Sequence, residues 1–213
     1  MTNNVPNPTN IYRIFHCENL ETILGNGGQF SRTAMKQNNI SYKDISNSNI
    51  QSIRSGFKVP LRTSTELHDY VPFYFTNRSP MLYACYCGNS DYDEGQEPII
   101  YLVSSVQELQ KKNINFLFTD GQGNKAGTKY YDKLSDLTEI DWDIIDSWSW
   151  GDRKEDLDRK RKKQAELIVH EFVPITAFTE IVVINESMKR KVQSILEKHN
   201  YSIPVEVRRN WYY

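Results

Sequence analysis

The sequence lacks several features that would assign a protein class directly. No apolar run approaches the roughly 18 residues that a membrane-spanning helix needs, so no span is predicted. The formal net charge is −1 over 213 residues, which excludes a uniformly basic surface as the basis for binding nucleic acid. The common nucleotide and zinc motifs, such as G-x-x-x-x-G-K-[ST], G-x-G-x-x-G and H-E-x-x-H, are absent.

Cysteine is also scarce, with Cys17, Cys85 and Cys87 the only three in the chain. Their number is odd, none has zinc-ligand spacing, and the four histidines are scattered, so no metal site is predicted. Residues 1–10 are rich in Asn, Thr and Pro and lack the apolar segment of a secretory signal, so we expect a short flexible lead-in. Reduced thiols in a cytoplasmic, non-membrane protein are the simplest expectation.

Hydrophobic patterning predicts a mixed α+β protein with many short strands and few helices. Apolar residues make up 38% of the chain, and its length suits a single domain spanning residues 1–213. The predicted strands are 11–16, 70–75, 98–104, 115–119, 166–172, 181–184 and 205–211. The predicted helices are 19–24, 79–87, 105–111, 157–163 and 187–199.

Two segments break this pattern. Residues 36–52 are polar and poorly periodic, which predicts a loop with at most a short helix. Residues 120–156 contain four glycines and mixed charge. An excursion of that length inside a compact domain is usually functional or disordered.

Three features have the residue types that chemistry requires. His16 ends a predicted strand, and the helix after it is closed by Gly27-Gly28; Arg54 follows the polar loop; and Glu166 begins another strand. Each also has an ordinary structural interpretation, since a lone histidine is commonly a satisfied structural residue and Gly-Gly a helix cap. Glu166 is the strongest candidate, because a carboxylate on an apolar strand face must border a cleft or have a partner.

An unbroken basic block precedes that glutamate. Arg159, Lys160, Arg161, Lys162 and Lys163 stand in sequence, after an acidic stretch at 132–146. Such a block is either a solvated helix face or a patch that attracts phosphate, and both interpretations remain open at this point.

Taken together, these segments resemble the DarT family of DNA ADP-ribosyltransferase toxins, over nearly the whole chain. The resemblance is carried by IYRIFH at 11–16 with Asn19-Leu20 and Gly27-Gly28, LHDYVPFYF at 67–75, RSPMLY at 78–83, FTDG at 118–121, RKRKKQAE at 159–166 and VRRNWYY at 207–213.

The resemblance implies an ADP-ribosyltransferase (PARP-like) fold, with a split, mostly antiparallel β core that holds NAD⁺ in its cleft. It implies that His16 and Asn19 bind the cofactor, with Gly27 and Gly28 shaping the nicotinamide pocket and 36–52 forming a loop on the NAD⁺ side. Glu166 corresponds to the catalytic glutamate. Arg54 corresponds to the active-site arginine, although its neighbours resemble the family less closely.

For DNA, the resemblance points to the 120–156 excursion and the basic block as the recognition elements. The implied contact residues are Tyr74, Met81, Gln122, Arg159, Lys160 and Arg161, and the aromatic residues Tyr130, Tyr131, Trp148 and Trp150 are further candidates. Family members, which usually modify thymidine, often have histidine where this chain has Gln122. Thymidine stays the first expectation for the target base, and this departure keeps guanosine as the second.

The implied function is a toxin that transfers ADP-ribose from NAD⁺ to a base in single-stranded DNA and so blocks replication. A macrodomain-containing, DarG-like antitoxin is the implied partner, and a monomer is expected. The alternatives are an NAD⁺ glycohydrolase, a transferase acting on RNA or protein, and a non-enzymatic module that binds single strands. The last leaves Glu166 beside the basic block unexplained, because a carboxylate there repels phosphate.

Overall fold

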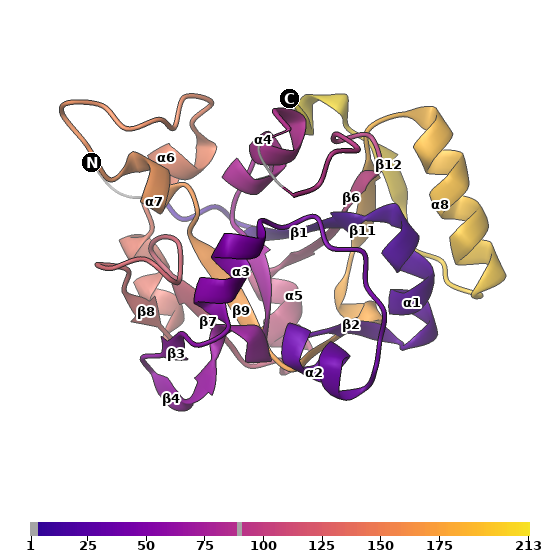
Figure 1. The fold of residues 1–213 in the computed structure, drawn as a ribbon, viewed down its shortest axis with the longest axis horizontal. Helices are drawn as coiled ribbons and strands as arrows, with labels where there is room; N and C mark the ends of the chain where they lie inside the picture. Colours follow the sequence, from indigo (N-terminus) through magenta and orange to yellow (C-terminus); the bar gives the residue numbers. More distant parts are fainter. Residues whose placement is uncertain (1–3, 89–90) are drawn as a thin grey trace.

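An eight-stranded sheet forms the centre of the computed structural model, which describes residues 4–88 and 91–213 (Figure 1). The strand order is β12 (Val205–Val207), β11 (Glu180–Val183), β6 (Ile99–Ser105), β1 (Asn10–His16), β5 (Tyr70–Tyr74), β9 (Glu166–His170), β7 (Phe116–Thr119) and β8 (Tyr130–Tyr131). The β11–β12 pair is parallel and the other neighbours are antiparallel. The predicted α+β class is confirmed.

The sheet is divided between β1 and β5. Strand β1 pairs with β6 continuously from Asn10↔Ser105 to His16↔Ile99, and β5 pairs with β9 over its whole length. The β1–β5 register has the single pair Tyr12↔Tyr74. The two halves therefore share a single ladder pair, with the Arg13 side chain donating a further hydrogen bond to Pro72 O, which is the split β core that the family resemblance implied.

Helices and two small sheets surround this core. The helices are α1 (Leu20–Gly25), α2 (Arg32–Gln37), α3 (Ser48–Arg54), α4 (Pro80–Tyr86), α5 (Val106–Lys111), α6 (Trp142–Asp146), α7 (Arg159–Lys162) and α8 (Glu186–Lys198). The small sheets pair β2 (Gly28–Phe30) with β10 (Phe172–Pro174) and β3 (Lys58–Val59) with β4 (Arg62–Glu66). Among the described residues, no helix is both long and apolar enough to cross a membrane.

Local capping sets several helix boundaries where the sequence predicts them. The Ser79 side chain accepts a hydrogen bond from Leu82 N, with Pro80 in the first turn of α4. Ser105 accepts one from Glu108 N at the start of α5. An N-cap of this kind is worth about 1 kcal/mol, which explains why these boundaries follow from the sequence.

Two predicted strands are shorter than expected. Residues 166–172 do not form one strand, because Glu171 has φ +58° and the chain turns after His170 to pair β10 with β2 in a separate sheet. The terminal strand ends at Val207, and Arg209–Trp211 form a 3-10 turn. The alternation of apolar residues cannot distinguish a continuous strand from one that changes sheets.

The 120–156 excursion is more ordered than a surface loop. Its middle part contains η3 (Leu134–Glu139) and α6, and Leu137, Ile140, Trp142 and Ile145 join the main hydrophobic core. The Trp142 indole also donates a 2.9 Å hydrogen bond to Leu137 O. Burial of these apolar side chains ties the excursion to the sheet, next to β9 and α7.

Candidate active site

A cavity of about 1310 Å³ opens beside the point where the two halves of the sheet separate. Its lining comes from β1, α2, α3, β5, α4, the start of β9 and the segment around Gln122. The predicted site residues that line it are Arg54, Tyr74, Met81, Gln122, Lys160 and Glu166. These six residues come from four separate parts of the chain and meet around one space, which we call the cleft.

A buried ion pair lies in this cleft. Arg54 is the last residue of α3 and Glu166 the first of β9. Their side chains form a bidentate pair, with Nη1 3.0 Å from Oε1 and Nη2 3.0 Å from Oε2. Glu166 is 3% exposed and Arg54 8% exposed, so each charge depends on the other for compensation.

A third donor orients the carboxylate. The backbone N–H of Gly123 donates a 2.8 Å hydrogen bond to Glu166 Oε1, and the Tyr130 hydroxyl donates one of 2.8 Å to Gly123 O. A Cβ at position 123 would lie 2.5 Å from Glu166 Oε1 and 2.9 Å from the Tyr130 hydroxyl. Only glycine lets the backbone approach this closely, so Gly123 and Tyr130 both belong to the site. On sequence alone Tyr130 is only a candidate base contact, and Gly123 is not singled out.

The electrostatics favour a charged arginine and protonated phenols. Burial lowers the pKa of Arg54, but the Glu166 carboxylate outweighs it and the net pKa is raised. Burial, followed by the Glu166 charge, raises the pKa of both Tyr74 and Tyr130 well above the usual value. At neutral pH the site therefore presents a guanidinium and two neutral hydroxyls around the carboxylate.

Tyr74 and Met81 lie next to this pair. Tyr74 is the register partner of Glu166 across β5 and β9, and its hydroxyl lies 3.7 Å from Met81 Sδ. Gln122 is 8% exposed and lines the same cavity. The structure thus brings all three residues to the Arg54–Glu166 pair, where they form a polarizable, partly apolar wall with one amide.

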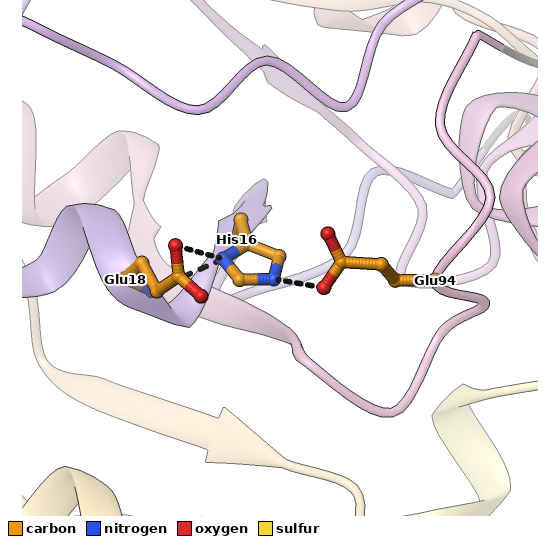
Figure 2. A group of neighbouring side chains, drawn as sticks. All are labelled: His16, Glu18 and Glu94. Carbon is orange, nitrogen blue, oxygen red and sulfur yellow. Dashed lines mark hydrogen bonds and ion pairs between the residues drawn. The ribbon is translucent and has the colours of Figure 1, made fainter.

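His16 lies elsewhere, beside a second cavity of about 310 Å³. It is 1% exposed; its Nε2 lies 3.3 Å from Glu94 Oε2, and its Nδ1 accepts a 3.2 Å hydrogen bond from Glu18 N (Figure 2). Burial and, after it, the Lys43 ammonium lower the pKa of His16. The histidine is thus neutral at pH 7 and does not line the cleft.

Figure 2 also shows a grouping with metal-ligand chemistry, since His16, Glu18 and Glu94 offer atoms within 4.8 Å of one another. However, Lys43 Nζ lies 3.3 Å from Glu18 Oε1 and 2.5 Å from Glu94 Oε1. The ammonium already compensates both carboxylates, so a cation would have to displace it.

Asn19, Gly27 and Gly28 contact backbone atoms of neighbouring segments in this structure. The Asn19 amide donates to Lys43 O at 2.8 Å and accepts from Lys43 N at 2.7 Å, which attaches the 36–52 segment to the end of β1. Gly28 packs directly against Val173 O, leaving no room for a side chain, and Gly27 O accepts a 2.8 Å hydrogen bond from Ile175 N. Neither glycine lines the cleft; Phe30 and Ser31, which follow them, do.

The basic block divides into residues with different environments. Arg161 is held by Asp120 at 2.8 Å and Asp158 at 2.7 Å, and Lys162 by Asp141 and Asp156. The Arg159 guanidinium donates to backbone carbonyls at 149 and 151. Of the five residues, only Lys160 lines the cleft, so the block does not form one continuous phosphate-attracting surface.

Lys163 is the largest departure from expectation, because it is buried at 2% exposure. Its Nζ donates to Ile145 O at 2.6 Å and to Ser147 O at 2.9 Å. Burial lowers its pKa to about 8. A lysine in a run of basic residues predicts solvent exposure, and nothing local in the sequence signals this anchoring role.

The four aromatic residues predicted as further DNA contacts also lie in different environments. Tyr130 supports Gly123, and Tyr131 stacks on Phe118 with ring centroids 5.5 Å apart. Trp150 lines the cleft, whereas Trp148 is 72% exposed.

Comparisons with known proteins agree on one family. The family model described as "ssDNA thymidine ADP-ribosyltransferase, DarT" matches residues 12–213. A DNA ADP-ribosyl transferase of Thermus sp. (strain 2.9) is 39% identical over 217 residues, covering 100% of both chains.

Solved structures are similar over the whole chain as well. Thermus sp. 2.9 DarT in complex with ADP-ribosylated ssDNA has a TM-score of 0.91 at 37% identity, covering 100% of both chains. The same Thermus protein in complex with NAD⁺ has a TM-score of 0.85 at 36% identity, covering 99% of this chain and 100% of that one.

Proposed function

The chain belongs to the DarT family of NAD⁺-dependent DNA ADP-ribosyltransferases, and we propose that its cleft transfers ADP-ribose from NAD⁺ to the base of a thymidine in single-stranded DNA. The observation that carries the proposal is the buried Arg54–Glu166 pair, which lies at the cleft among Tyr74, Met81 and Gln122.

Glu166 supports the bond-breaking step. As the bond between ribose C1′ and nicotinamide breaks, nicotinamide leaves with the bonding electron pair and positive charge builds on the ribose, as in glycoside hydrolysis. A carboxylate that accepts a hydrogen bond from the ribose 2′-hydroxyl stabilises this charge. Because Glu166 is oriented by Gly123 N–H and Arg54, it acts by preorganised electrostatics.

Arg54 acts as a fixed positive charge. The base nitrogen attacks C1′ and releases its proton to solvent water, so negative charge accumulates on the base before or during transfer. An arginine whose pKa is raised by Glu166 is a poor proton acceptor, and charge stabilisation is its larger role. When the ribose 2′-hydroxyl donates a hydrogen bond to one carboxylate oxygen of Glu166, Arg54 loses one of its two hydrogen bonds to that carboxylate.

The cofactor and the DNA approach the pair from different elements. In this proposal the 36–52 segment, attached through Asn19, and His16 hold the adenosine side of NAD⁺, and the Gly27-Gly28 turn shapes the nicotinamide pocket. The two cavities described above do not join His16 to Arg54, and in this proposal the 36–52 segment shifts when NAD⁺ binds. The excursion 120–156 carries the DNA-facing residues.

Tyr74, Met81 and Gln122 contact the target base, and Lys160 and Arg159 contact phosphates. Arg161 acts through Asp120 and packs against Gly121, which fixes the position of Gln122. The Gln122 amide both donates and accepts, so it can pair with the edge of thymine. The same amide can pair with guanine, which is the second candidate base.

The biological setting follows from the family. We propose that the chain is a toxin that acts in the cytoplasm, where NAD⁺ and replicating DNA are available, and that a macrodomain-containing antitoxin accompanies it. The described residues contain no membrane-spanning helix.

The direct test is incubation with NAD⁺ and oligonucleotides in which thymine or guanine is the only modifiable base, followed by mass spectrometry. Addition of ADP-ribose to the thymine oligonucleotide alone supports the proposal, and addition to the guanine one alone supports the second base. Release of nicotinamide with no nucleic-acid adduct identifies a glycohydrolase. Labelling of RNA or protein in place of DNA overturns the substrate assignment.

A further inference from the structure

Exposed and half-buried aromatic side chains gather at one edge of the cleft. We name Tyr83, Tyr86, Trp148, Trp150 and Tyr213 the rim cluster. Tyr83 is 40% exposed, Tyr86 54% and Trp148 72%. Large aromatic side chains contribute most when they are buried, so a contiguous exposed group marks a binding surface.

The cluster is assembled from segments far apart in the sequence. The ring of Tyr213 lies at 4.9 Å from Tyr83, in an edge contact, and is stacked with Tyr86 at 6.1 Å. Trp150 packs edge-on against Tyr83 at 5.7 Å, and its indole N–H lies 3.4 Å from the Tyr213 hydroxyl. Figure 1 shows the C-terminus directly beside α4, where these residues meet.

Backbone contacts hold the last residue in place. Tyr213 N donates a 2.9 Å hydrogen bond to Gln96 Oε1, and Gln96 Nε2 donates to Tyr213 O. The Tyr213 hydroxyl donates to Arg78 O at 3.1 Å. The rings are therefore preorganised in the free protein, which lowers the entropic cost of binding a planar ligand.

Arg78 adds a positive charge to this surface. Its guanidinium carbon lies 3.9 Å from the centroid of the Trp148 ring and 4.3 Å from that of Tyr213. No carboxylate pairs with Arg78 in the parts of the chain that the structure describes. Aromatic faces next to a cation are the combination that binds single-stranded nucleic acid, through base stacking and phosphate attraction.

The rim cluster is continuous with the cleft. Tyr83 and Trp150 line the cleft together with Lys160, while Tyr86 and Trp148 are not part of its lining. A strand that places one base at Glu166 would therefore leave the cleft over Trp150 and Tyr83. We propose that the rim cluster stacks a base next to the target nucleotide, with Arg78 facing its phosphate; this subsite rests on the proposed DNA substrate.

The test compares Trp148→Ala and Tyr86→Ala with Leu61→Ala, a control at the β3–β4 turn that is itself 40% exposed. The substrates are an oligonucleotide extended on both sides of one thymidine, and a series in which each flanking nucleotide in turn is abasic. Stacking of one base predicts that each aromatic variant raises KM for the intact oligonucleotide by about 5- to 150-fold. The Leu61→Ala variant retains the wild-type KM.

The abasic series separates a direct contact from a general loss of structure. In the wild type, one abasic position raises KM by a similar factor, and in Trp148→Ala the same position has no further effect, because the two changes remove the same interaction. Additive effects, or an unchanged KM in both aromatic variants, overturn the subsite. An unchanged KM combined with lost binding of a partner protein would assign the surface to that partner instead. Failure of the proposed function is a distinct result, since the wild type would then modify no oligonucleotide.

Discussion

Replacement of Glu166 by Gln tests the catalytic assignment with the least disturbance. The amide keeps the shape of the side chain and one acceptor oxygen for Gly123 N–H, but removes the charge that faces Arg54. Loss of one preorganised electrostatic group typically lowers kcat by about 10²–10³-fold, or roughly 2.7–4 kcal/mol. We therefore expect DNA modification to fall by that factor while NAD⁺ still binds.

The structure also explains why Gln is a better choice than Ala. Both variants remove the charge that compensates the buried Arg54 guanidinium, and breaking a buried pair costs about 3–5 kcal/mol of stability. Glu166→Ala also removes both acceptor oxygens and leaves a cavity, whereas Gln keeps one acceptor oxygen and the volume of the side chain. A loss of activity in the Ala variant would then combine unfolding with lost catalysis. Urea unfolding of both variants measures the difference.

A second Glu–Arg pair provides a matched control. Glu180 and Arg208 also form a bidentate pair, with oxygen–nitrogen distances of 2.5 and 2.7 Å, and neither lines the cleft. Glu180→Gln should therefore retain the wild-type kcat. The assay is single-turnover transfer to a thymidine oligonucleotide, with NAD⁺ titrated by calorimetry. Near wild-type transfer by Glu166→Gln, or an equal loss in Glu180→Gln, would refute the reasoning.

Three further outcomes are expected. Annealing the complementary strand should suppress modification sharply, because extruding a base from a duplex costs a few kcal/mol; equal labelling of duplex and single strand would count against the substrate. Lys160→Gln should lower the salt dependence of oligonucleotide binding by about 0.7 in log–log slope without changing NAD⁺ affinity, whereas Lys111→Gln, an exposed control on α5 outside the cleft, should leave the slope unchanged. Burial, followed by Arg32 and Arg54, lowers the pKa of His68 to about 4. As the pH falls, His68 of the unfolded chain therefore binds a proton near pH 6.5, whereas His68 of the folded chain binds it only near pH 4. Stability should fall as pH falls through that window, and His68→Gln should flatten the fall in urea midpoint; an unchanged profile would contradict the assignment.

Lys163 has a predicted effect of its own. Lys163→Met removes the donor to two backbone carbonyls, and leaving such groups unsatisfied costs about 1–3 kcal/mol of unfolding free energy. Lys154→Met should stay within about 0.5 kcal/mol of the wild type, as expected of a surface change. Equal denaturation midpoints for the two variants would show that the lysine is not an anchor.

Comparison with known proteins confirms the family, the fold class, the enzyme class and the use of NAD⁺ that the sequence resemblance implied. The role of each site residue, the domain boundaries and the target base remain predictions. Several residues lie in environments that differ from those predicted from the sequence.

What the sequence determined by itself is local. Alternating apolar residues predicted β1 and β5, Ser79 and Ser105 predicted the starts of α4 and α5, and the capping hydrogen bonds of those serines are present. These features arise from interactions within a few residues, so the neighbouring sequence contains the information that specifies them.

The tertiary structure alone decided which side chains meet. Arg54 and Glu166 are 112 positions apart, and their pairing depends on how α3 packs over the opening of the sheet. Lys163 is buried although its neighbours on both sides are polar, because carbonyls at the end of α6 need a donor. Glu171 redirects the chain into a second sheet. Long-range packing and hydrogen-bond satisfaction set these arrangements, and no local periodicity encodes either.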